Sequence, residues 1–239
     1  MMKKIHLQGI MLFLLTAIVF NSCISNCKHG RGELVKENRE PGTFSGIRLK
    51  VPANLIIEQG STPSFSIEAQ ENIQKIISTT LKEETLIIES SECIGDNKGI
   101  NIYIQLPVFT KLVVEGSGEI HSKNSLTSDQ LGLAVNGSGF ISVKADAALL
   151  FCGIKGSGEV KISGTGKTQH VKVEGSGSFK GEDFHVFHSD ASISGSGDAT
   201  VAADSSLQAN VNGSGSIRYV GNPKIDQRVN GSGSISRLK

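Results

Sequence analysis

Seven copies of the tripeptide Gly-Ser-Gly limit what this chain can fold into more than any other feature of its sequence. The copies follow one another at intervals of 18 to 21 residues, between residues 116 and 233. A fixed period of this length is typical of solenoid proteins, in which each repeat forms one coil that stacks on the next. We therefore assign a structural role to both glycines of every copy, namely Gly116, Gly118, Gly137, Gly139, Gly156, Gly158, Gly175, Gly177, Gly195, Gly197, Gly213, Gly215, Gly231 and Gly233.

The residues around each tripeptide alternate between apolar and polar. Period-two alternation rich in β-branched residues predicts short strands, and the glycines mark bends where a Cβ would clash or where φ must be positive. Two positions before the copies stand Val114, Val135, Ile154, Val173, Ile193, Val211 and Val229. Two positions after them stand Ile120, Ile141, Val160, Phe179, Ala199, Ile217 and Ile235.

The repeat predicts an all-β fold, a single-stranded right-handed parallel β-helix (solenoid) whose coils lie about 4.8 Å apart. Roughly 19 residues per coil fits three short strands and three turns, with each Val or Ile above its counterpart in the next coil. The β-helix domain is expected over 43–239, with irregular first coils at 43–107 and the repeats at 108–239. The composition agrees, since 28 glycines, no Trp and 5% aromatic residues favour a thin repetitive core.

The N-terminus has the pattern of an export signal. Two lysines precede the apolar run from Ile10 to Phe20, which is too short for a bilayer span of about 20 residues but suits a signal peptide. The run is followed by Ser22 and Cys23, a pair that resembles the lipobox of bacterial lipoproteins. We expect cleavage before Cys23 and lipid attachment to it. The alternative is an ordinary signal peptide cut nearby.

This interpretation divides the N-terminal region into a lipoprotein signal peptide at 1–22 and a flexible polar tether at 23–42. It makes the membrane a partner through the lipid, and it places the protein in the cell envelope. The expected site is the outer membrane, with the periplasmic and the surface-facing side both open.

Three further cysteines need separate interpretations. Cys27 and Cys93 lie in polar stretches, and an envelope protein can form disulfides, so a bridge between them is left open. Cys152 stands where other coils carry Leu, Val or Ala, which predicts a small buried apolar side chain. No spacing of Cys and His in the chain suggests a zinc site.

The chain resembles a known family in four places. They are the segment Phe44–Ile47, the segment Ile56–Gly60, the strand Leu86–Ile88 and the ladder of Gly-Ser-Gly copies. On these residues, residues 43–239 resemble the family described as "putative autotransporter adhesin, head GIN domain", which is common in Bacteroidetes lipoproteins. The resemblance implies a right-handed β-helix and an adhesive role. It brings no catalytic residues.

Little in the sequence points to chemistry. Glu119, Glu159 and Asp198 occupy one repeat position in alternate coils, about 9–10 Å apart, but such scatter is common on a solvated face. The sequence group that most resembles a metal site contains two aspartates and two histidines. If this stretch is a strand, the two histidines lie on opposite faces of it. These residues are Asp183, His185, His188 and Asp190. We predict no catalytic residue, no metal site and no cofactor.

Binding is the better-supported class of function. The 24 basic residues nearly balance the 23 acidic ones, which gives no basis for nucleic-acid binding. The polar residue before each tripeptide forms an outward column that could bind a glycan, or that could simply stabilise neighbouring coils as a stacking ladder. This column contains Glu115, Asn136, Lys155, Glu174, Ser194, Asn212 and Asn230.

The sequence thus predicts a non-enzymatic envelope lipoprotein that acts as an adhesin, binding module or scaffold, with a glycan or a protein surface as its partner. A glycan-active enzyme of the polysaccharide lyase or hydrolase type is the alternative, and a purely structural periplasmic protein is a third option. The C-terminal end carries no evident capping element, which leaves a homo-oligomer contact open.

Overall fold

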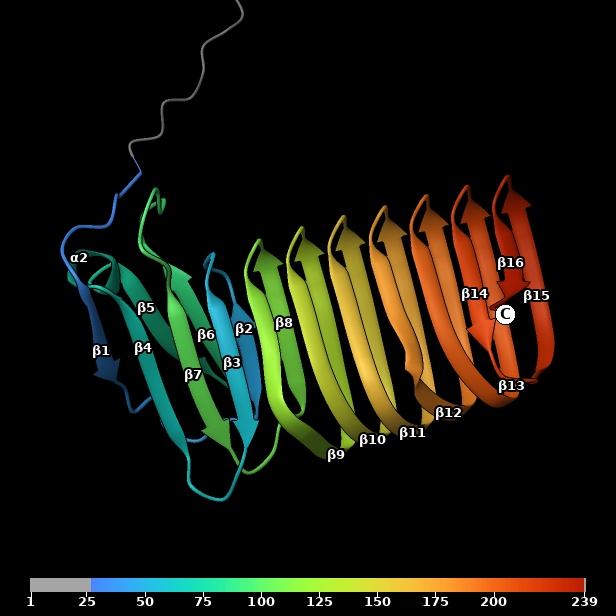
Figure 1. Cartoon of the computed structure of the whole chain (residues 1–239), viewed down its shortest axis with the longest axis horizontal. Helices are drawn as coiled ribbons and strands as arrows, with labels where there is room; N and C mark the ends of the chain where they lie inside the picture. Colours follow the sequence, from blue (N-terminus) through green and yellow to red (C-terminus); the bar gives the residue numbers. More distant parts are fainter. Residues whose placement is uncertain (1–26, 239) are drawn as a thin grey trace, which may run out of the picture.

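The computed structural model describes residues 27–238, and its repeats form successive coils of a parallel β-solenoid (Figure 1). Five long strands each run from one Gly-Ser-Gly copy to the next and pair in parallel with their neighbours. They are β9 (Glu119–Gly137), β10 (Phe140–Gly156), β11 (Glu159–Gly175), β12 (Ser178–Gly195) and β13 (Asp198–Gly213). The rod ends with β14 (Ser216–Val220), β15 (Lys224–Gly231) and β16 (Ser234–Arg237). The predicted all-β solenoid is confirmed.

The rod has two broad faces. The first half of β9 pairs with β3 (Asn54–Gln59), and its second half pairs with β8 (Lys111–Gly116). We call the sheet formed by β3, the first halves of the coils, β14 and β16 face 1. The sheet formed by β8, the second halves and β15 is face 2.

The expected division of each coil into three short strands is wrong. The coils from β9 to β13 are continuous strands of 19, 17, 17, 18 and 16 residues. Between β10 and β11 the register is kept through the bend, where small residues pair, Ala145 with Gly164 and Ala147 with Gly166. The other coil pairs resume their pairing after a register shift at this bend.

Like residues lie over like inside the rod. The β-branched residues before the tripeptides pair in succession and are at most 2% exposed from Val114 to Val211. The apolar residues after the tripeptides form a second continuous column, at most 1% exposed from Ile120 to Ile217. The alternation in the sequence therefore predicts both core columns correctly.

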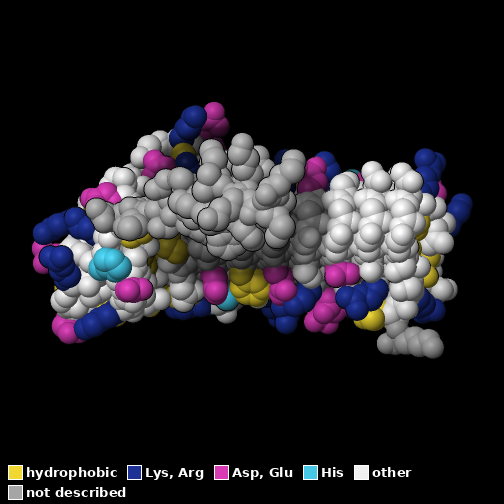
Figure 2. Space-filling model, turned by 90° about the horizontal axis from the view of Figure 1, so that it is seen from above, with side chains coloured by type: hydrophobic (Ala, Val, Ile, Leu, Met, Phe, Trp, Pro, Cys, Tyr) yellow, Lys and Arg dark blue, Asp and Glu magenta, His cyan; other side chains and the backbone are white. Residues whose placement is uncertain are grey.

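The two glycines of each tripeptide are required for different reasons. The first glycine of every copy has a backbone φ between 106° and 131°, a region that residues other than glycine rarely adopt. The second meets a steric limit, because a Cβ on Gly158 would lie 2.4 Å from Cγ1 of Val135 and 2.6 Å from the carbonyl oxygen of Gly139. Seen from above, this edge of the C-terminal coils is free of apolar and charged side chains (Figure 2).

An N-terminal cap continues both faces with separate strands. Face 1 extends beyond β3 through β7 (Asn101–Leu106), β4 (Ser64–Gln70) and β1 (Leu34–Asn38). Face 2 extends beyond β8 through β2 (Gly46–Leu49), β6 (Thr85–Ser90) and β5 (Ile77–Lys82). The outer pairs are antiparallel, and the short helix α2 (Glu71–Gln74) packs against β4. Residues 43–107 thus continue both sheets, in parallel pairing next to β8 and β9 and in antiparallel pairing farther out.

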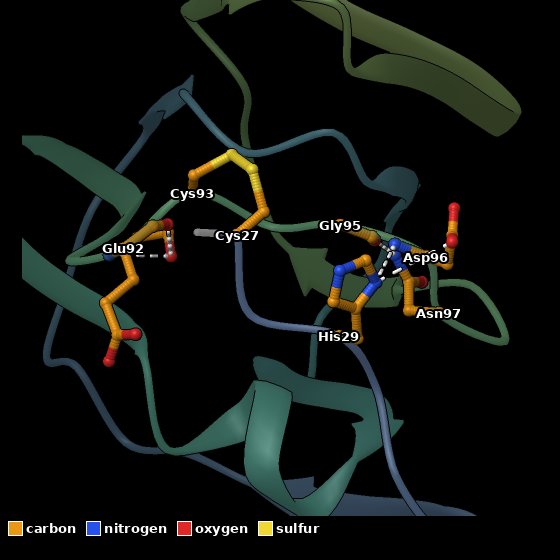
Figure 3. Close-up of a disulfide and its surroundings, with 8 residues drawn as sticks. Cys27, His29, Glu92, Cys93, Gly95, Asp96 and Asn97 are labelled. Carbon is orange, nitrogen blue, oxygen red and sulfur yellow. Dashed lines mark hydrogen bonds and ion pairs between the residues drawn. A yellow bond between two sulfur atoms is a disulfide. The ribbon is translucent and has the colours of Figure 1, made fainter. Parts of the chain in front are cut away.

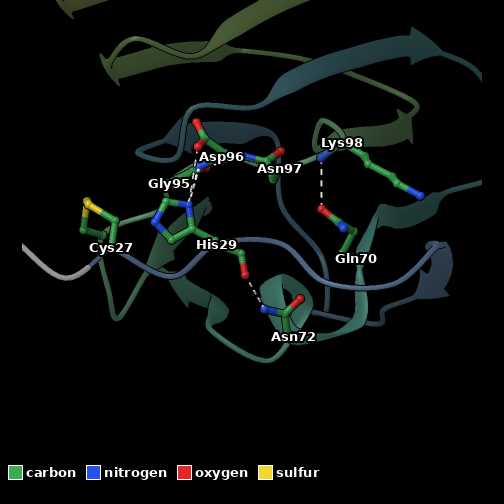
Figure 4. A network of polar contacts seen from close by, with 9 residues as sticks. Cys27, His29, Gln70, Asn72, Gly95, Asp96, Asn97 and Lys98 are labelled. Carbon is green, nitrogen blue, oxygen red and sulfur yellow. Dashed lines mark hydrogen bonds and ion pairs between the residues drawn. A yellow bond between two sulfur atoms is a disulfide. The ribbon is translucent and has the colours of Figure 1, made fainter.

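The flexible tether expected at 23–42 is wrong for the part that the structure describes. Cys27 forms a disulfide with Cys93, which decides the bridge that the sequence left open (Figure 3). His29, two residues after Cys27, is held by two hydrogen bonds (Figure 4). The side chain of Asn72 donates one of 2.7 Å to the His29 carbonyl, and the backbone N–H of Asp96 donates one of 3.2 Å to the His29 ring. Strand β1 then pairs with β4. The signal peptide and Cys23 lie outside the described residues.

A pair of glycine substitutions tests the corner. Gly158→Ala introduces a Cβ against Val135 and Gly139, so it should lower the free energy of unfolding by about 1–3 kcal/mol. Gly153→Ala in the preceding strand is the control, because nothing lies within 4 Å of its added Cβ. Urea unfolding monitored by circular dichroism measures both. Equal stability of the two variants would contradict the steric explanation.

The disulfide gives a second test. It links residues separated by 66 positions, so removing it with the double substitution Cys27→Ser and Cys93→Ser should cost about 4 kcal/mol in the chain-entropy model. Thermal unfolding of the oxidised protein should show a lower midpoint for the double variant. Reduction of the unsubstituted protein should reproduce that loss. An unchanged midpoint in both experiments would show that the bridge does not pin the N-terminal segment.

Candidate functional site

The outer surface of face 2 is hollowed along the rod axis. The hollow has a volume of about 610 Å³ and crosses β8 and the second halves of β9, β10, β11 and β12. Its floor is low because Gly132, Ala134 and Gly153 place small side chains, or none, at successive outward positions. The hollow therefore follows from a local run of small residues on an otherwise side-chain-covered sheet.

Two stacked rings border this floor. Phe151 and His170 are neighbours in the register of β10 and β11, and their ring centroids lie 5.2 Å apart with an angle of 13° between the planes. Phe151 is 42% exposed, whereas phenylalanine side chains are usually buried. His170 also faces Asp190 on the next strand, with 3.6 Å between Nδ1 and a carboxylate oxygen. The hollow thus combines an aromatic surface with a polar end.

Charged side chains form a rim beside the rings. Lys172 lies within the hollow and forms an ion pair with Glu174, which also contacts Lys155 at 3.4 Å. Hydrogen bonding to Lys172, and next to Lys155, lowers the pKa of the Glu174 carboxyl. All three side chains are at least one-third exposed, so they offer charges to a ligand without a large desolvation cost.

Two neighbouring pairs of the outward column before the tripeptides contact each other as in a stacking ladder. At its start Glu115 pairs with Arg48 of β2, and at its end the amide of Asn230 donates to Asn212 at 3.3 Å. Lys155 and Glu174 pair in between. These contacts join neighbouring coils, which favours the stabilising interpretation of this column over a glycan-binding one.

The carboxylates considered for catalysis do lie in one column of face 1. Glu119, Glu159 and Asp198 occupy one register position and alternate with non-acidic residues. Glu119 pairs with His121 at 3.0 Å, and Glu159 pairs with Lys180 at 2.7 Å. Acidic side chains at intervals on one side of the rod are visible in Figure 2. Both carboxylates therefore have side-chain partners on a solvated face, a hydrogen bond for Glu119 and an ion pair for Glu159.

The four residues considered for a metal site do not come together. Asp183 and His185 lie opposite Ser163 and Thr165 of the preceding coil. His188 instead contacts the Ser206 hydroxyl at 2.9 Å, and Asp190 belongs to the hollow. Within residues 27–238 no group of three potential ligands is close enough to hold a metal ion.

Cys152 is 4% exposed in the core beneath the hollow, as its repeat position predicts. Burial raises the pKa of its thiol far above the usual range. The thiol is therefore neutral and shielded, and it contributes packing rather than nucleophilic chemistry.

Comparison with known proteins identifies the family. The family model for "Putative auto-transporter adhesin, head GIN domain" matches residues 43–223. The chain belongs to this family. Comparison with curated proteins finds no match.

Solved structures agree with the assignment. The chain is similar to a "putative adhesin" from Bacteroides fragilis, with 26% identity, a TM-score of 0.84, and coverage of 88% of this chain and 100% of that one. A "putative lipid binding protein" from Parabacteroides distasonis has 24% identity and a TM-score of 0.71, with coverage of 89% and 99%. A "putative adhesin" from Parabacteroides merdae has 19% identity, a TM-score of 0.71 and the same coverage. The last two similarities concern the fold alone.

Sequence reasoning missed the hollow and its rings. The only available signal was that Phe151 stands at an outward repeat position, where other coils carry Lys111, Gly132, His170 and Asp190. A tabulation of the outward columns, in addition to the inward ones, would have found it. Among the described residues, no helix is long and apolar enough to cross a membrane.

Proposed function

We propose that this family member is a non-enzymatic adhesin-type module of the cell envelope that binds an extended ligand along the hollow of face 2. The observation that carries the proposal is the exposed Phe151–His170 stack beside a floor of small residues. Ligand sites commonly combine an apolar surface with a few polar groups that fix orientation, and Lys172 and Asp190 supply those groups here.

A linear glycan suits this surface better than a compact molecule. The hollow spans five strands, which corresponds to about 19 Å along the rod. A sugar ring presents an apolar face that can lie on Phe151 and hydroxyl groups that can bond to Asp190 and Lys172. Repeated units of a polymer would meet similar positions on successive coils.

The non-enzymatic part of the proposal is supported by the ion pairs of face 1. Glu119 and Glu159 are engaged by neighbouring basic side chains, and the nearest carboxylate to the hollow, Asp190, faces His170. In the described part of the chain no observation favours the alternative of a glycan-active enzyme.

Attachment to the membrane is part of the proposal. The disulfide supports an oxidising compartment, as expected for an exported protein. Only four peptide units separate the lipidation site Cys23 from Cys27, which lies in the cap, and they span at most about 14 Å. A lipid on Cys23 would therefore hold the cap close to the membrane. The last coils lie at the opposite end of the rod (Figure 1).

An array of linear oligosaccharides tests the binding surface. Phe151→Ala removes the exposed ring, and Gly153→Trp fills the hollow, so each should weaken binding at least tenfold, equivalent to about 1.4 kcal/mol. The matched control is Phe187→Ala, because this ring is 55% exposed and lies outside the hollow. Turnover of any oligosaccharide, no binding to the array, or equal losses in all three variants would overturn the proposal.

Substitution of Cys23 tests the anchor. Cys23→Ser should move the protein from the membrane pellet to the soluble fraction after cell lysis, while the neighbouring substitution Ser25→Ala should not. Protease treatment of intact cells then determines whether the module faces the surface or the periplasm. A Cys23→Ser variant that stays in the pellet would contradict lipid anchoring at this residue.

A further inference from the structure

The C-terminal end of the rod is an open sheet edge. Strand β15 pairs with β13 on one side, and no described strand pairs with its other side. The end also exposes the core column, since Val229 is 45% exposed whereas Val211, its counterpart one coil earlier, is 2% exposed. An exposed strand edge next to apolar side chains is a template for pairing with another strand.

The outward side chains of β15 carry charges of both signs. Lys224, Asp226 and Arg228 are exposed and point to the same side of the sheet, and none of their side chains forms an ion pair or hydrogen bond within residues 27–238. Charged side chains on an edge strand discourage pairing where like charges meet directly across the two strands. The alternation of positive and negative charge here allows the opposite outcome.

We propose that β15 pairs antiparallel with β15 of a second copy of this chain, centred on Gln227. In this arrangement Asp226 lies opposite Arg228 of the second copy, and Ile225 lies opposite Val229 of the second copy. Residues directly opposite each other in an antiparallel pair share a face, so two Asp–Arg pairs form outside and two Ile–Val pairs form inside. The seven residues from 224 to 230 take part.

Neighbouring alignments are less favourable. Moving the centre by one residue places Asp226 opposite itself, or Arg228 opposite itself, and like charges directly opposite are destabilising. An alignment centred between two residues would place inward side chains opposite outward ones. The pleat of the sheet would then turn the apolar side chains Ile225 and Val229 of one copy to the solvent side. The sequence of β15 therefore selects one two-fold arrangement.

The contact joins two rods end to end through their C-terminal ends. With the anchor proposed above at the cap, the two membrane attachment points would lie at the far ends of the pair. Such a dimer suits a link between two opposing membranes. This last step rests on the proposed function, whereas the strand pairing does not.

Cysteine cross-linking of the full chain, purified in detergent, tests the alignment. Asp226→Cys and Arg228→Cys are prepared separately and mixed under mild oxidation. Directly opposite Cα atoms lie about 4.5–5.5 Å apart, within the range for a disulfide, whereas diagonal neighbours lie roughly 7–8 Å apart. A covalent dimer should form in the mixture, and not with either variant alone or with the unsubstituted protein. No dimer in the mixture, or equal dimer with each variant alone, overturns the proposal.

Charge reversal gives an independent readout by light scattering coupled to size-exclusion chromatography. Asp226→Arg and Arg228→Asp should each weaken dimerisation at least tenfold, because each leaves like charges opposite each other. The combined substitution restores both Asp–Arg pairs and should recover the dimer. These side chains are exposed, so the variants should fold, which circular dichroism verifies. A monomer throughout, or a dimer that no variant weakens, contradicts the inference, and neither result depends on glycan binding.

Discussion

The close approach of successive coils at the Gly-Ser-Gly corner is the constraint on which this structure depends. The second glycine of one coil lies so near the corresponding glycine of the preceding coil that a Cβ has no space. The freed volume is occupied by a methyl group of the β-branched residue from the preceding coil, as Val135 shows at Gly158. Each tripeptide and the Val or Ile of the preceding coil are therefore two parts of one packing unit.

This unit sets what the rest of the molecule can do. It fixes the inward columns, so nearly all sequence freedom lies in the outward ones. Several of those columns carry side chains that pair with the next coil, as Lys155 and Glu174 do. Where small residues replace them between β8 and β12 on face 2, the hollow forms, with Phe151 and His170 stacked beside it. The candidate site is thus an interruption of the ladder rather than an added element.

The fold could be predicted from the sequence because the repeat reports directly on stacking. The columns from Val114 to Val211 and from Ile120 to Ile217 follow from spacing alone. The cap was harder, because its strands lack a repeat and pair partly antiparallel. The polar composition around strand β1 predicts a tether, and all five residues of the strand are exposed, so no buried apolar positions mark it in the sequence. Its position depends on backbone pairing with β4 and on the distant disulfide.

The hollow could not be predicted for a related reason. It arises from residues of five strands that are neighbours only after stacking, and no short motif encodes it. Once the register is known, the outward neighbours of Phe151 can be derived by counting positions from each tripeptide. Sequence reasoning covers the two core columns and the polar column that contains Lys155. The columns that carry the hollow contain Gly153 and Phe151, two and four residues before Lys155.

Pulsed electron–electron spin resonance measures the stacking most directly. Spin labels at Asn136 paired with labels at Ser194, Asn212 or Asn230 probe one outward column across three, four and five coils. The account predicts distances that rise by about 4.8 Å per coil, from roughly 14 to 24 Å, despite a growing chain separation. Distances that do not rise by this increment would contradict the stacked coil.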